Sequence, residues 1–264
     1  LVGSEMCIRD SDIHDADALI IRTRTRCDET LLKGSKVSFI ATATIGYDHL
    51  DIEYLKRAHI TWTNCPGCNA NSVGQYIHSC LLLLEKEKGY NLSKTTVGLV
   101  GVGHVGHAVI EAIRPLGVQI LLNDPPQKEA LRKAGKPHEF FLKMEELQEK
   151  CDIISFHTPL ITKGPYPTFH LANKTFFNAL KKQPIIINTS RGAVVDNTDV
   201  LQALKDGIIR DAIIDTWENE PNINQELLNL IYIGTPHIAG YSADGKANAC
   251  LLYTSDAADD TPCV

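Results

Sequence analysis

Two polar side chains in the last third of the sequence have the types that dehydrogenation of an alcohol requires. Arg191 lies in the segment Asn-Thr-Ser-Arg-Gly, and His237 lies in Thr-Pro-His-Ile-Ala-Gly. Loss of a hydride from an alcohol carbon requires the hydroxyl proton to leave, and a histidine that titrates near neutral pH is a suitable base. The planar guanidinium group of an arginine matches a carboxylate. We therefore interpret Arg191 and His237 as candidate catalytic residues for the oxidation of a hydroxy acid.

A carboxylate beside the histidine would orient its ring and stabilise the imidazolium. Two candidates, Glu218 and Glu220, lie in the segment Asp-Thr-Trp-Glu-Asn-Glu-Pro, and the chemistry alone does not choose between them. Taken singly, a surface salt bridge explains a glutamate here and a capped loop explains His237. The three polar groups taken together favour a catalytic site.

A glycine-rich turn supplies a candidate cofactor site. Gly101, Gly103 and Gly106 follow an apolar run and precede a helical pattern, which gives the spacing G-x-G-x-x-G between a strand and a helix. In this arrangement Gly101 permits a tight turn, Gly103 lets the backbone approach a pyrophosphate, and Gly106 lets helix and strand pack closely. The turn predicts a dinucleotide site.

The residues around the turn favour NAD as the dinucleotide. His104 and Val105 begin the predicted helix, so their backbone N–H groups would face the phosphates. Asp124 ends the second strand about 20 residues beyond the glycines, where a carboxylate accepts hydrogen bonds from ribose hydroxyls. The same carboxylate would repel a 2′-phosphate, and Pro125 rather than an arginine follows it. We therefore predict NAD rather than NADP.

Short apolar runs alternate with amphipathic stretches along the chain, a pattern typical of an α/β protein with a parallel sheet. Several runs are continuous in Val, Ile and Leu, as expected for strands covered on both faces. Arg191, Glu220 and His237 each follow such a run, so the carboxyl ends of the strands would bring them together. The predicted strands cover residues 18–22, 37–41, 61–64, 96–100, 119–123, 152–157, 185–188, 211–215 and 232–235.

The strand pattern divides the chain into two parts. Residues 1–92 contain three strands and a long apolar helix at 72–88. Residues 93–238 contain six strands, enough for a complete doubly wound NAD-binding domain. Residues 239–264 would return toward the first part.

Four segments together resemble the D-2-hydroxyacid dehydrogenase family. They are the glycine turn, Ser-Arg-Gly-Ala-Val-Val-Asp, Asp-x-Trp-Glu-x-Glu-Pro and Pro-His-Ile-Ala-Gly. The resemblance implies a Rossmann-type domain that binds NAD and a smaller, flavodoxin-like substrate domain, here truncated. It also implies that Arg191, Glu220 and His237 are catalytic, which selects Glu220 over Glu218.

Further segments resemble one subgroup of that family, whose members oxidise 4-phospho-D-erythronate to a 2-oxo acid in the synthesis of pyridoxal 5'-phosphate, vitamin B6. These segments lie at residues 41–51, 66–70, 157–165 and 237–246, and the match covers nearly all of residues 12–249. The resemblance implies further contacts: with NAD through Thr158, Asp215 and Gly240, and with the substrate through Thr23, Thr44 and Tyr241. It also implies that the full-length protein is a homodimer. Alternatives are another family member, such as a phosphoglycerate dehydrogenase, and a binding protein that senses NAD without turnover.

Several other polar residues are candidates for a function outside the catalytic set. Arg22, Arg24 and Arg26 alternate after a strand, and we favour a phosphate clamp for Arg22 and a solvated edge for the other two. Cys65 and Cys68 form a C-x-x-C without a second pair, so we predict no metal site. Ordinary structural explanations suffice for six histidines, with the backbone rather than the ring of His104 facing phosphate: His49, His78, His104, His107, His157 and His170.

The composition limits the classes of partner and compartment. A net charge of −6 favours neither nucleic acid nor an anionic membrane as a partner. No apolar run reaches the roughly 18–20 residues that span a bilayer, and no secretory signal begins the chain. The eight cysteines fall at irregular intervals, as expected for reduced thiols in the cytoplasm.

The two ends of the sequence lack patterns continuous with their neighbours. Residues 6–11 and 250–260 resemble translated sequencing adapters, so we expect residues 1–11 and 250–264 to be non-native; ordinary frayed termini are the alternative. The chain then reads as a fragment. We expect it to lack the first strand of the substrate domain, the returning helix and the C-terminal dimerisation domain of the subgroup.

Overall fold

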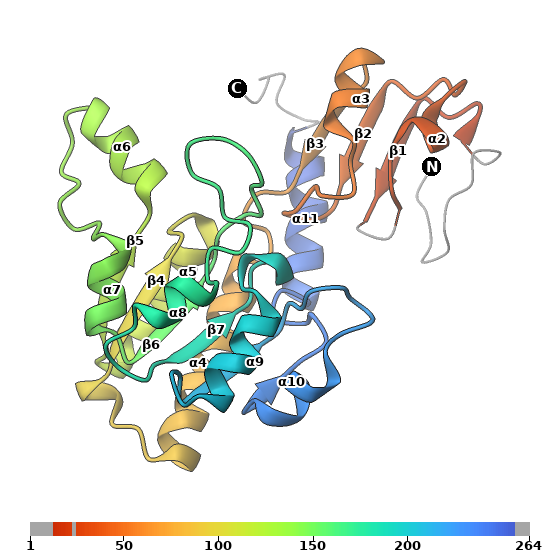
Figure 1. Ribbon diagram of the computed structural model, residues 1–264. Helices are drawn as coiled ribbons and strands as arrows, with labels where there is room; N and C mark the ends of the chain where they lie inside the picture. The colour runs from red at the N-terminus through yellow and green to blue at the C-terminus, as the bar shows by residue number, and fades with distance from the viewer. Residues whose placement is uncertain (1–12, 23–24, 257–264) are drawn as a thin grey trace. The chain divides into compact units, whose positions relative to one another are not determined.

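The computed structural model describes residues 13–22 and 25–256, with the backbone alone for residues 250–256 (Figure 1). The chain forms two compact units. One consists of Leu1–Asn69 with Ser242–Val264, and the other is Ala70–Tyr241. All nine predicted strands are present in the described residues, with ends that differ from the predicted ones by at most two residues.

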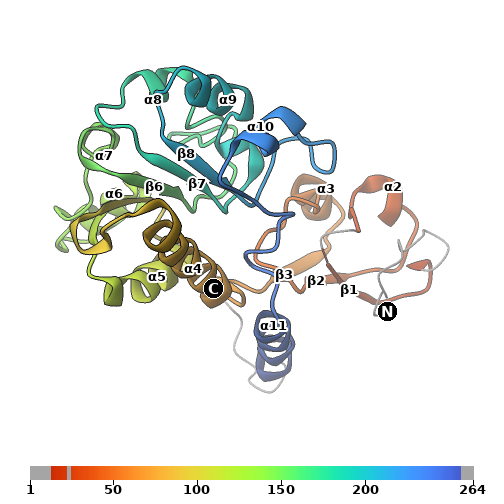
Figure 2. The ribbon, with the colours of Figure 1, turned by 90° about the horizontal axis from the view of Figure 1, so that it is seen from below.

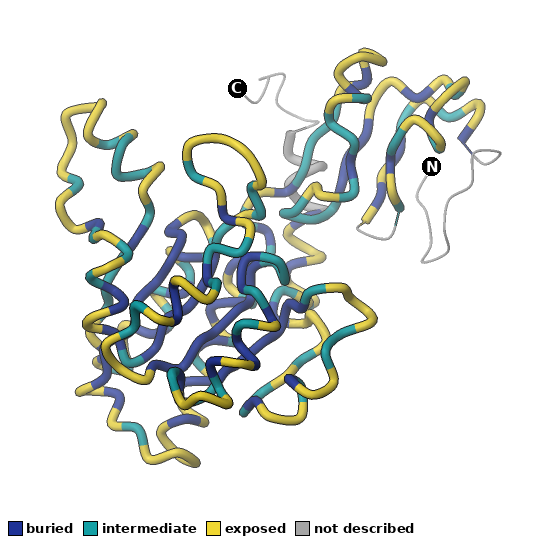
Figure 3. Tube along the Cα trace, viewed as in Figure 1, coloured by how far each residue is buried: buried dark blue, intermediate teal, exposed yellow. Residues whose placement is uncertain are grey.

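The larger unit contains a six-stranded parallel sheet with the order β5-β4-β6-β7-β8-β9. Its central strands β4, β6 and β7 are buried along their whole length (Figure 3). The chain moves outward from β4 to β5 and then returns to the other side of β4, so the strand order reverses between β4 and β6. Ligands bind at such switch points, beyond the carboxyl ends of the strands. The strands are β4 (Thr96–Val100), β5 (Gln119–Asn123), β6 (Ile153–Phe156), β7 (Ile185–Asn188), β8 (Asp211–Ile214) and β9 (Ile233–Gly234).

Helices cover both faces of this sheet, which confirms the doubly wound prediction (Figure 2). One face packs against α4 (Ala70–Lys88) and α5 (His104–Ile113). The other packs against α7 (Met144–Lys150), α8 (Lys174–Asn178), α9 (Asn197–Lys205) and α10 (Gln225–Leu230). Shorter or peripheral elements of the unit are η1 (Leu92–Lys94), η2 (Arg114–Leu116), α6 (Pro125–Lys133) and η3 (Gly192–Val194).

Helix α4 belongs to the larger unit, so the structural boundary at residue 70 differs from the expected one after residue 92. Ile77 and Leu84 of this helix are fully buried in one core with Leu99 of β4. A Cβ atom on Gly74 would lie 2.8 Å from the carbonyl oxygen of Ala108, so α4 and α5 approach closely. The sequence predicted this helix but not the sheet on which it packs.

The smaller unit contains a parallel sheet of three strands in the order β1-β2-β3. Leu19, Ile40 and Leu55 are fully buried in its core. Its elements are β1 (Ala18–Ile21), α2 (Glu29–Leu32), β2 (Phe39–Thr42), α3 (Ile52–Arg57), β3 (Thr61–Asn64) and α11 (Ala243–Asp256).

Helix α11 lies at the end of the described part. Its backbone is helical from Ala243 to Asp256 and so crosses residue 249, after which we expected the native sequence to end. Ala249 on this helix is buried in a small cluster with Cys65 and Cys68. The suspect segment 250–264 is therefore in part helical, whereas residues 1–12 and 257–264 lie outside the described part.

None of the helices within residues 13–22 and 25–256 combines the length and the apolar composition that crossing a membrane demands.

Candidate active site

The three glycines of the turn after β4 meet three different surroundings. Gly101 has φ +90°, and a Cβ atom there would lie 2.8 Å from the carbonyl oxygen of His157. A Cβ atom on Gly106 would collide with the carbonyl oxygen of Gly101, so α5 packs tightly on the turn. A Cβ atom on Gly103 would enter open space. The turn therefore leaves room at Gly103, the position predicted to approach a pyrophosphate.

The surroundings of the turn fit a dinucleotide. Helix α5 begins at His104, and its N-cap Gly103 has no side chain to occupy the free N–H groups. Thr158, which follows β6, lies against the turn, since a Cβ atom on Gly101 would be 2.9 Å from its methyl group. The hydroxyl oxygen of Thr158 is buried without a hydrogen-bond partner. A buried hydroxyl without a partner calls for an explanation, and a ligand group at the switch point provides one.

Asp124 connects the glycine turn to the end of β5. Its Oδ2 accepts a hydrogen bond from the Val102 N–H at 2.8 Å, and its Oδ1 accepts one from the Gln127 N–H at 2.9 Å. The first bond places the carboxylate at the turn, and the second caps α6. This position is compatible with the predicted contact to ribose.

Glu220 and His237 form a hydrogen-bonded pair. Glu220 Oε2 lies 2.9 Å from His237 Nδ1, and Glu220 Oε1 accepts a hydrogen bond from the Trp217 N–H at 2.7 Å. The pair is partly exposed, with half of the His237 side chain accessible. His237 has φ 56°, a left-handed conformation that non-glycine residues adopt mainly at functional sites and tight turns. The ring is thus held by its partner and by the backbone.

The pair shifts the pKa of each member. The hydrogen bond to Glu220 raises the pKa of His237 above its ordinary value; burial and the charge of Arg191 oppose this, and the charges of Glu220 and Asp215 support it. Burial favours a higher pKa for Glu220, but the hydrogen bonds from His237 and Trp217 and the charges of His237 and Arg191 together bring it below its ordinary value. The imidazolium of His237 is therefore favoured beside an ionised Glu220.

Arg191 follows β7 after two intervening residues, Thr189 and Ser190, and is the N-cap of η3. One guanidinium nitrogen donates to the Ser190 carbonyl oxygen at 2.8 Å. Its positive charge lowers the pKa of both Glu220 and His237, so the three predicted residues share one electrostatic site. The structure brings together the side chains that the sequence placed after three different strands.

Asp215 fixes the loop of His237 through hydrogen bonds, a role that the sequence analysis did not predict. The residue is 1% exposed. Its carboxylate accepts hydrogen bonds from the Thr235 hydroxyl at 2.6 Å, the Ile238 N–H at 2.7 Å and the Ala239 N–H at 3.0 Å. The Thr235 hydroxyl also lies 2.8 Å from the hydroxyl of Tyr76 in α4. The only signal for this role in the sequence was the position of Asp215, a charged residue at the end of a predicted buried strand.

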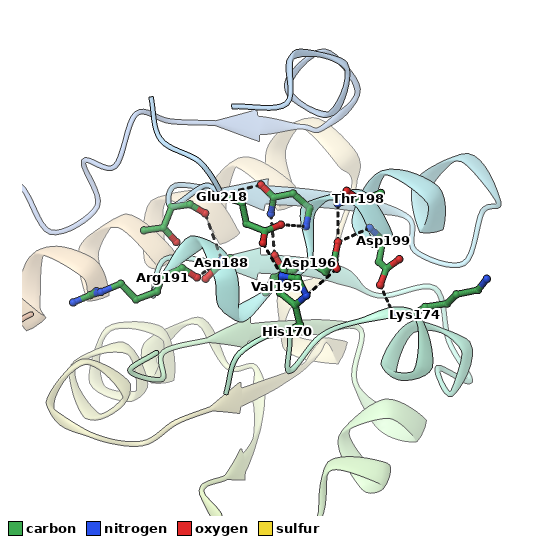
Figure 4. A network of polar contacts seen from close by, with 11 residues as sticks. His170, Lys174, Asn188, Arg191, Val195, Asp196, Thr198, Asp199 and Glu218 are labelled. Atoms are coloured by element: carbon green, nitrogen blue, oxygen red, sulfur yellow. Dashed lines mark hydrogen bonds and ion pairs between the residues drawn. The ribbon is translucent and has the colours of Figure 1, made fainter. Parts of the chain in front are cut away.

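Glu218 does not face His237. Its Oε1 lies 2.7 Å from His170 Nε2, and its Oε2 accepts a hydrogen bond from the Asn197 N–H at 2.8 Å (Figure 4). The chemistry alone did not choose between Glu218 and Glu220, but their hydrogen bonds do, because only Glu220 contacts His237. His170, which we expected to be ordinary, lies in a network of carboxylates.

The predicted substrate residues lie in both units. Arg22 is exposed, and the Thr44 hydroxyl donates to the Gly46 carbonyl oxygen at 2.8 Å. Tyr241 is 56% exposed at the end of the larger unit and follows Gly240 in a turn. Thr23 lies outside the described residues, as does Arg24.

The described residues offer no cluster of three or more His, Cys, Asp or Glu side chains that could hold a metal ion. Cys65 and Cys68 are both buried, and burial raises the pKa of Cys68. Arg26, set aside as a phosphate ligand, forms an ion pair with Asp28 at 3.0 Å.

Comparison with known proteins finds a matching family and several similar proteins. Residues 81–239 match the family described as "D-isomer specific 2-hydroxyacid dehydrogenase, NAD binding domain". The chain is 56% identical over 240 residues to an erythronate-4-phosphate dehydrogenase of Bacteroides fragilis, covering 91% of this chain and 68% of the relative. It is 45% identical to the protein of the same name from Porphyromonas gingivalis, covering 93% of this chain and 66% of that one.

Solved structures share the fold. The NAD-bound 3-phosphoglycerate dehydrogenase of Entamoeba histolytica is 28% identical, with a TM-score of 0.78 over 95% of this chain and 80% of that one. The D-lactate dehydrogenase of Aquifex aeolicus, complexed with NAD and lactic acid, is 22% identical, also with a TM-score of 0.78, over 95% of this chain and 84% of that one.

Proposed function

The chain belongs to the D-isomer specific 2-hydroxyacid dehydrogenases and is an NAD-dependent oxidoreductase, and we propose that it oxidises 4-phospho-D-erythronate to the corresponding 2-oxo acid. The observation that carries the chemistry is the hydrogen bond of 2.9 Å between Glu220 and His237, within the field of Arg191. The substrate rests on the relatives that are 45–56% identical and named for it. The reaction belongs to the synthesis of pyridoxal 5'-phosphate.

His237 takes the hydroxyl proton in this proposal. Nδ1 of its ring donates to Glu220, which leaves the lone pair of Nε2 as the acceptor. Glu220 fixes the orientation of the ring and stabilises the imidazolium that forms. The guanidinium group of Arg191 would bind the substrate carboxylate and hold the reacting carbon in place. Bound NAD supplies the acceptor for the hydride.

The cofactor contacts follow from the glycine turn. Gly101, Gly103 and Gly106 would let the pyrophosphate reach the backbone N–H groups of His104 and Val105. Asp124 would bind the ribose, and the remaining proposed contacts with NAD are Thr158, Asp215 and Gly240.

The substrate contacts are proposed in both units. Arg22 would bind the phosphate, with Thr23, Thr44 and Tyr241 as further contacts. We also propose that the protein works in the cytoplasm and that the full-length protein is a homodimer.

A panel of hydroxy acids tests the proposal. kcat/KM is measured for 4-phospho-D-erythronate, D-erythronate, 3-phospho-D-glycerate and D-lactate, with NAD and then with NADP. We expect the first acid and NAD to give the highest kcat/KM. Equal kcat/KM for the phosphorylated and unphosphorylated erythronates would remove the assigned substrate. NAD binding without turnover of any acid would contradict the enzymatic function and favour the alternative of an NAD-sensing binding protein.

A further inference from the structure

His170 lies between the carboxylates of Asp196 and Glu218. Its Nδ1 is 3.0 Å from Asp196 Oδ2, and its Nε2 is 2.7 Å from Glu218 Oε1 (Figure 4). The three side chains are largely shielded from solvent, with exposed fractions of 29%, 18% and 19%. The Phe169 ring stacks on the imidazole at a centroid distance of 4.0 Å.

The two contacts differ in kind. Nε2 forms a hydrogen bond with Glu218, whereas Nδ1 and Asp196 lie within ion-pair distance. An ionised carboxylate oxygen only accepts hydrogen bonds, so Nε2 carries the proton in the bond to Glu218.

Each carboxylate is itself fixed by backbone N–H groups. Asp196 Oδ1 caps α9 by accepting hydrogen bonds from the Thr198 N–H at 2.9 Å and the Asp199 N–H at 3.0 Å. Glu218 Oε2 accepts from the Asn197 N–H at 2.8 Å, and Asn197 Oδ1 accepts from the Glu218 N–H at 3.1 Å. The carboxylates are thus rigid acceptors for the ring.

The network joins the loop of Arg191 to the loop of Glu220. Between Arg191 and Asp196 the chain forms η3, and the backbone N–H of His170 donates to the Ala193 carbonyl oxygen at 2.8 Å. Gly192 packs so closely on the backbone of Trp217 that a Cβ atom would collide with its carbonyl oxygen. Glu218 lies two residues before Glu220 in the second loop.

We propose that His170, held between Asp196 and Glu218, is a positioning residue that fixes the loops carrying Arg191 and Glu220. The inference rests on the proposed function, because it concerns the geometry of that reaction. It gives Glu218 a role distinct from that of Glu220. The chemical step itself does not use His170.

NMR of the imidazole nitrogens tests the bond to Glu218. In the 264-residue chain with 15N-labelled histidine, we expect Nε2 of His170 to carry a proton. His170→Gln assigns the signals by removing them. A His170 ring without a proton on Nε2 would overturn the proposal.

Kinetics test the positioning role. We expect His170→Gln to lower kcat/KM for the hydroxy acid by on the order of 10- to 100-fold, with the Kd for NAD unchanged, because the glycine turn lies on other elements. His138→Gln is the matched control, since His138 also lies next to a glutamate, Glu139, at 3.8 Å. A His170→Gln protein with the kcat/KM of the control would contradict the role.

A double-mutant cycle separates positioning from general damage. If His170 and Glu218 act through one bond, the loss in kcat/KM of the His170→Gln/Glu218→Gln protein is smaller than the product of the two single losses. Independent, multiplicative losses would overturn the proposal. Where His170→Gln does not fold, Glu218→Gln carries the kinetic test. If the wild-type chain oxidises none of the acids, the proposed function fails, whereas the NMR measurement still decides whether His170 donates to Glu218.

Discussion

The pairing of Glu220 with His237 sets the acid–base behaviour at the level of single residues. His237 has a left-handed backbone conformation, and a hydrogen bond of 2.9 Å to one carboxylate oxygen of Glu220 orients its ring. The other oxygen of Glu220 is fixed by the Trp217 N–H. A base with a raised pKa beside a fixed carboxylate suits a proton transfer that reverses with the direction of the reaction.

The first prediction concerns the pH dependence of oxidation. Oxidation requires neutral His237, so kcat/KM rises as the pH increases through the raised pKa of this residue. Glu220→Gln removes the hydrogen bond that is the largest cause of the raised pKa. We expect the acidic limb of the pH profile to move to lower pH and kcat to fall. Glu218→Gln is the control, because Glu218 faces His170; its limb stays in place. An unmoved limb in Glu220→Gln would contradict the assignment.

The second prediction concerns stability and His157. This ring is 8% exposed and contacts the hydroxyl groups of Ser155 and Thr189, and burial lowers its pKa to about 4. Below the ordinary value of 6.5 the unfolded chain binds the proton and the folded one does not. The free energy of unfolding therefore decreases as the pH falls from about 6.5 to about 4, by on the order of 3 kcal/mol at most.

Urea unfolding at two pH values measures this effect. We expect His157→Gln to lose less stability than the wild type between about pH 7 and about pH 5, since other acid-sensitive groups are common to both proteins. An equal loss in the two proteins would show that His157 is not the source.

At the scale of elements, the turn between β4 and α5 separates packing from binding. Gly106→Ala would collide with the Gly101 carbonyl oxygen, so we expect a loss of about 1–3 kcal/mol in the free energy of unfolding. Gly103→Ala enters open space at φ −73°, so we expect wild-type stability and a higher Kd for NAD. Thermal unfolding and calorimetric titration with NAD measure the two effects. Unchanged NAD affinity in Gly103→Ala would exclude a close approach of the pyrophosphate there.

The sequence predicted the elements better than their partners. The strands could be found because buried parallel strands are continuous runs of Val, Ile and Leu, as in β7. The packing of α4 on the larger sheet could not be found, because the apolar residues of a helix do not show in the sequence which sheet they cover. Likewise, the type of Glu218 indicated a functional carboxylate, but only the fold shows that His170, 48 residues earlier, is its partner.

At the scale of the whole molecule, the proposed chemistry is concentrated in one unit. Residues 70–241 contain the glycine turn, Asp124, Arg191, Glu220 and His237. Two of the residues proposed to bind the substrate, Arg22 and Thr44, lie in the other unit. Such a division fits enzymes in which one unit binds the cofactor and another selects the substrate.

The transfer of hydrogen from substrate to cofactor tests the central claim most directly. 4-Phospho-D-erythronate is deuterated at the hydroxyl-bearing carbon next to the carboxylate, and the reduced cofactor is analysed by mass spectrometry. We predict that deuterium passes to NAD, and that His237→Ala slows the transfer by about 10²- to 10⁴-fold. Reduced cofactor without deuterium, or transfer at the wild-type rate in His237→Ala, would contradict the account.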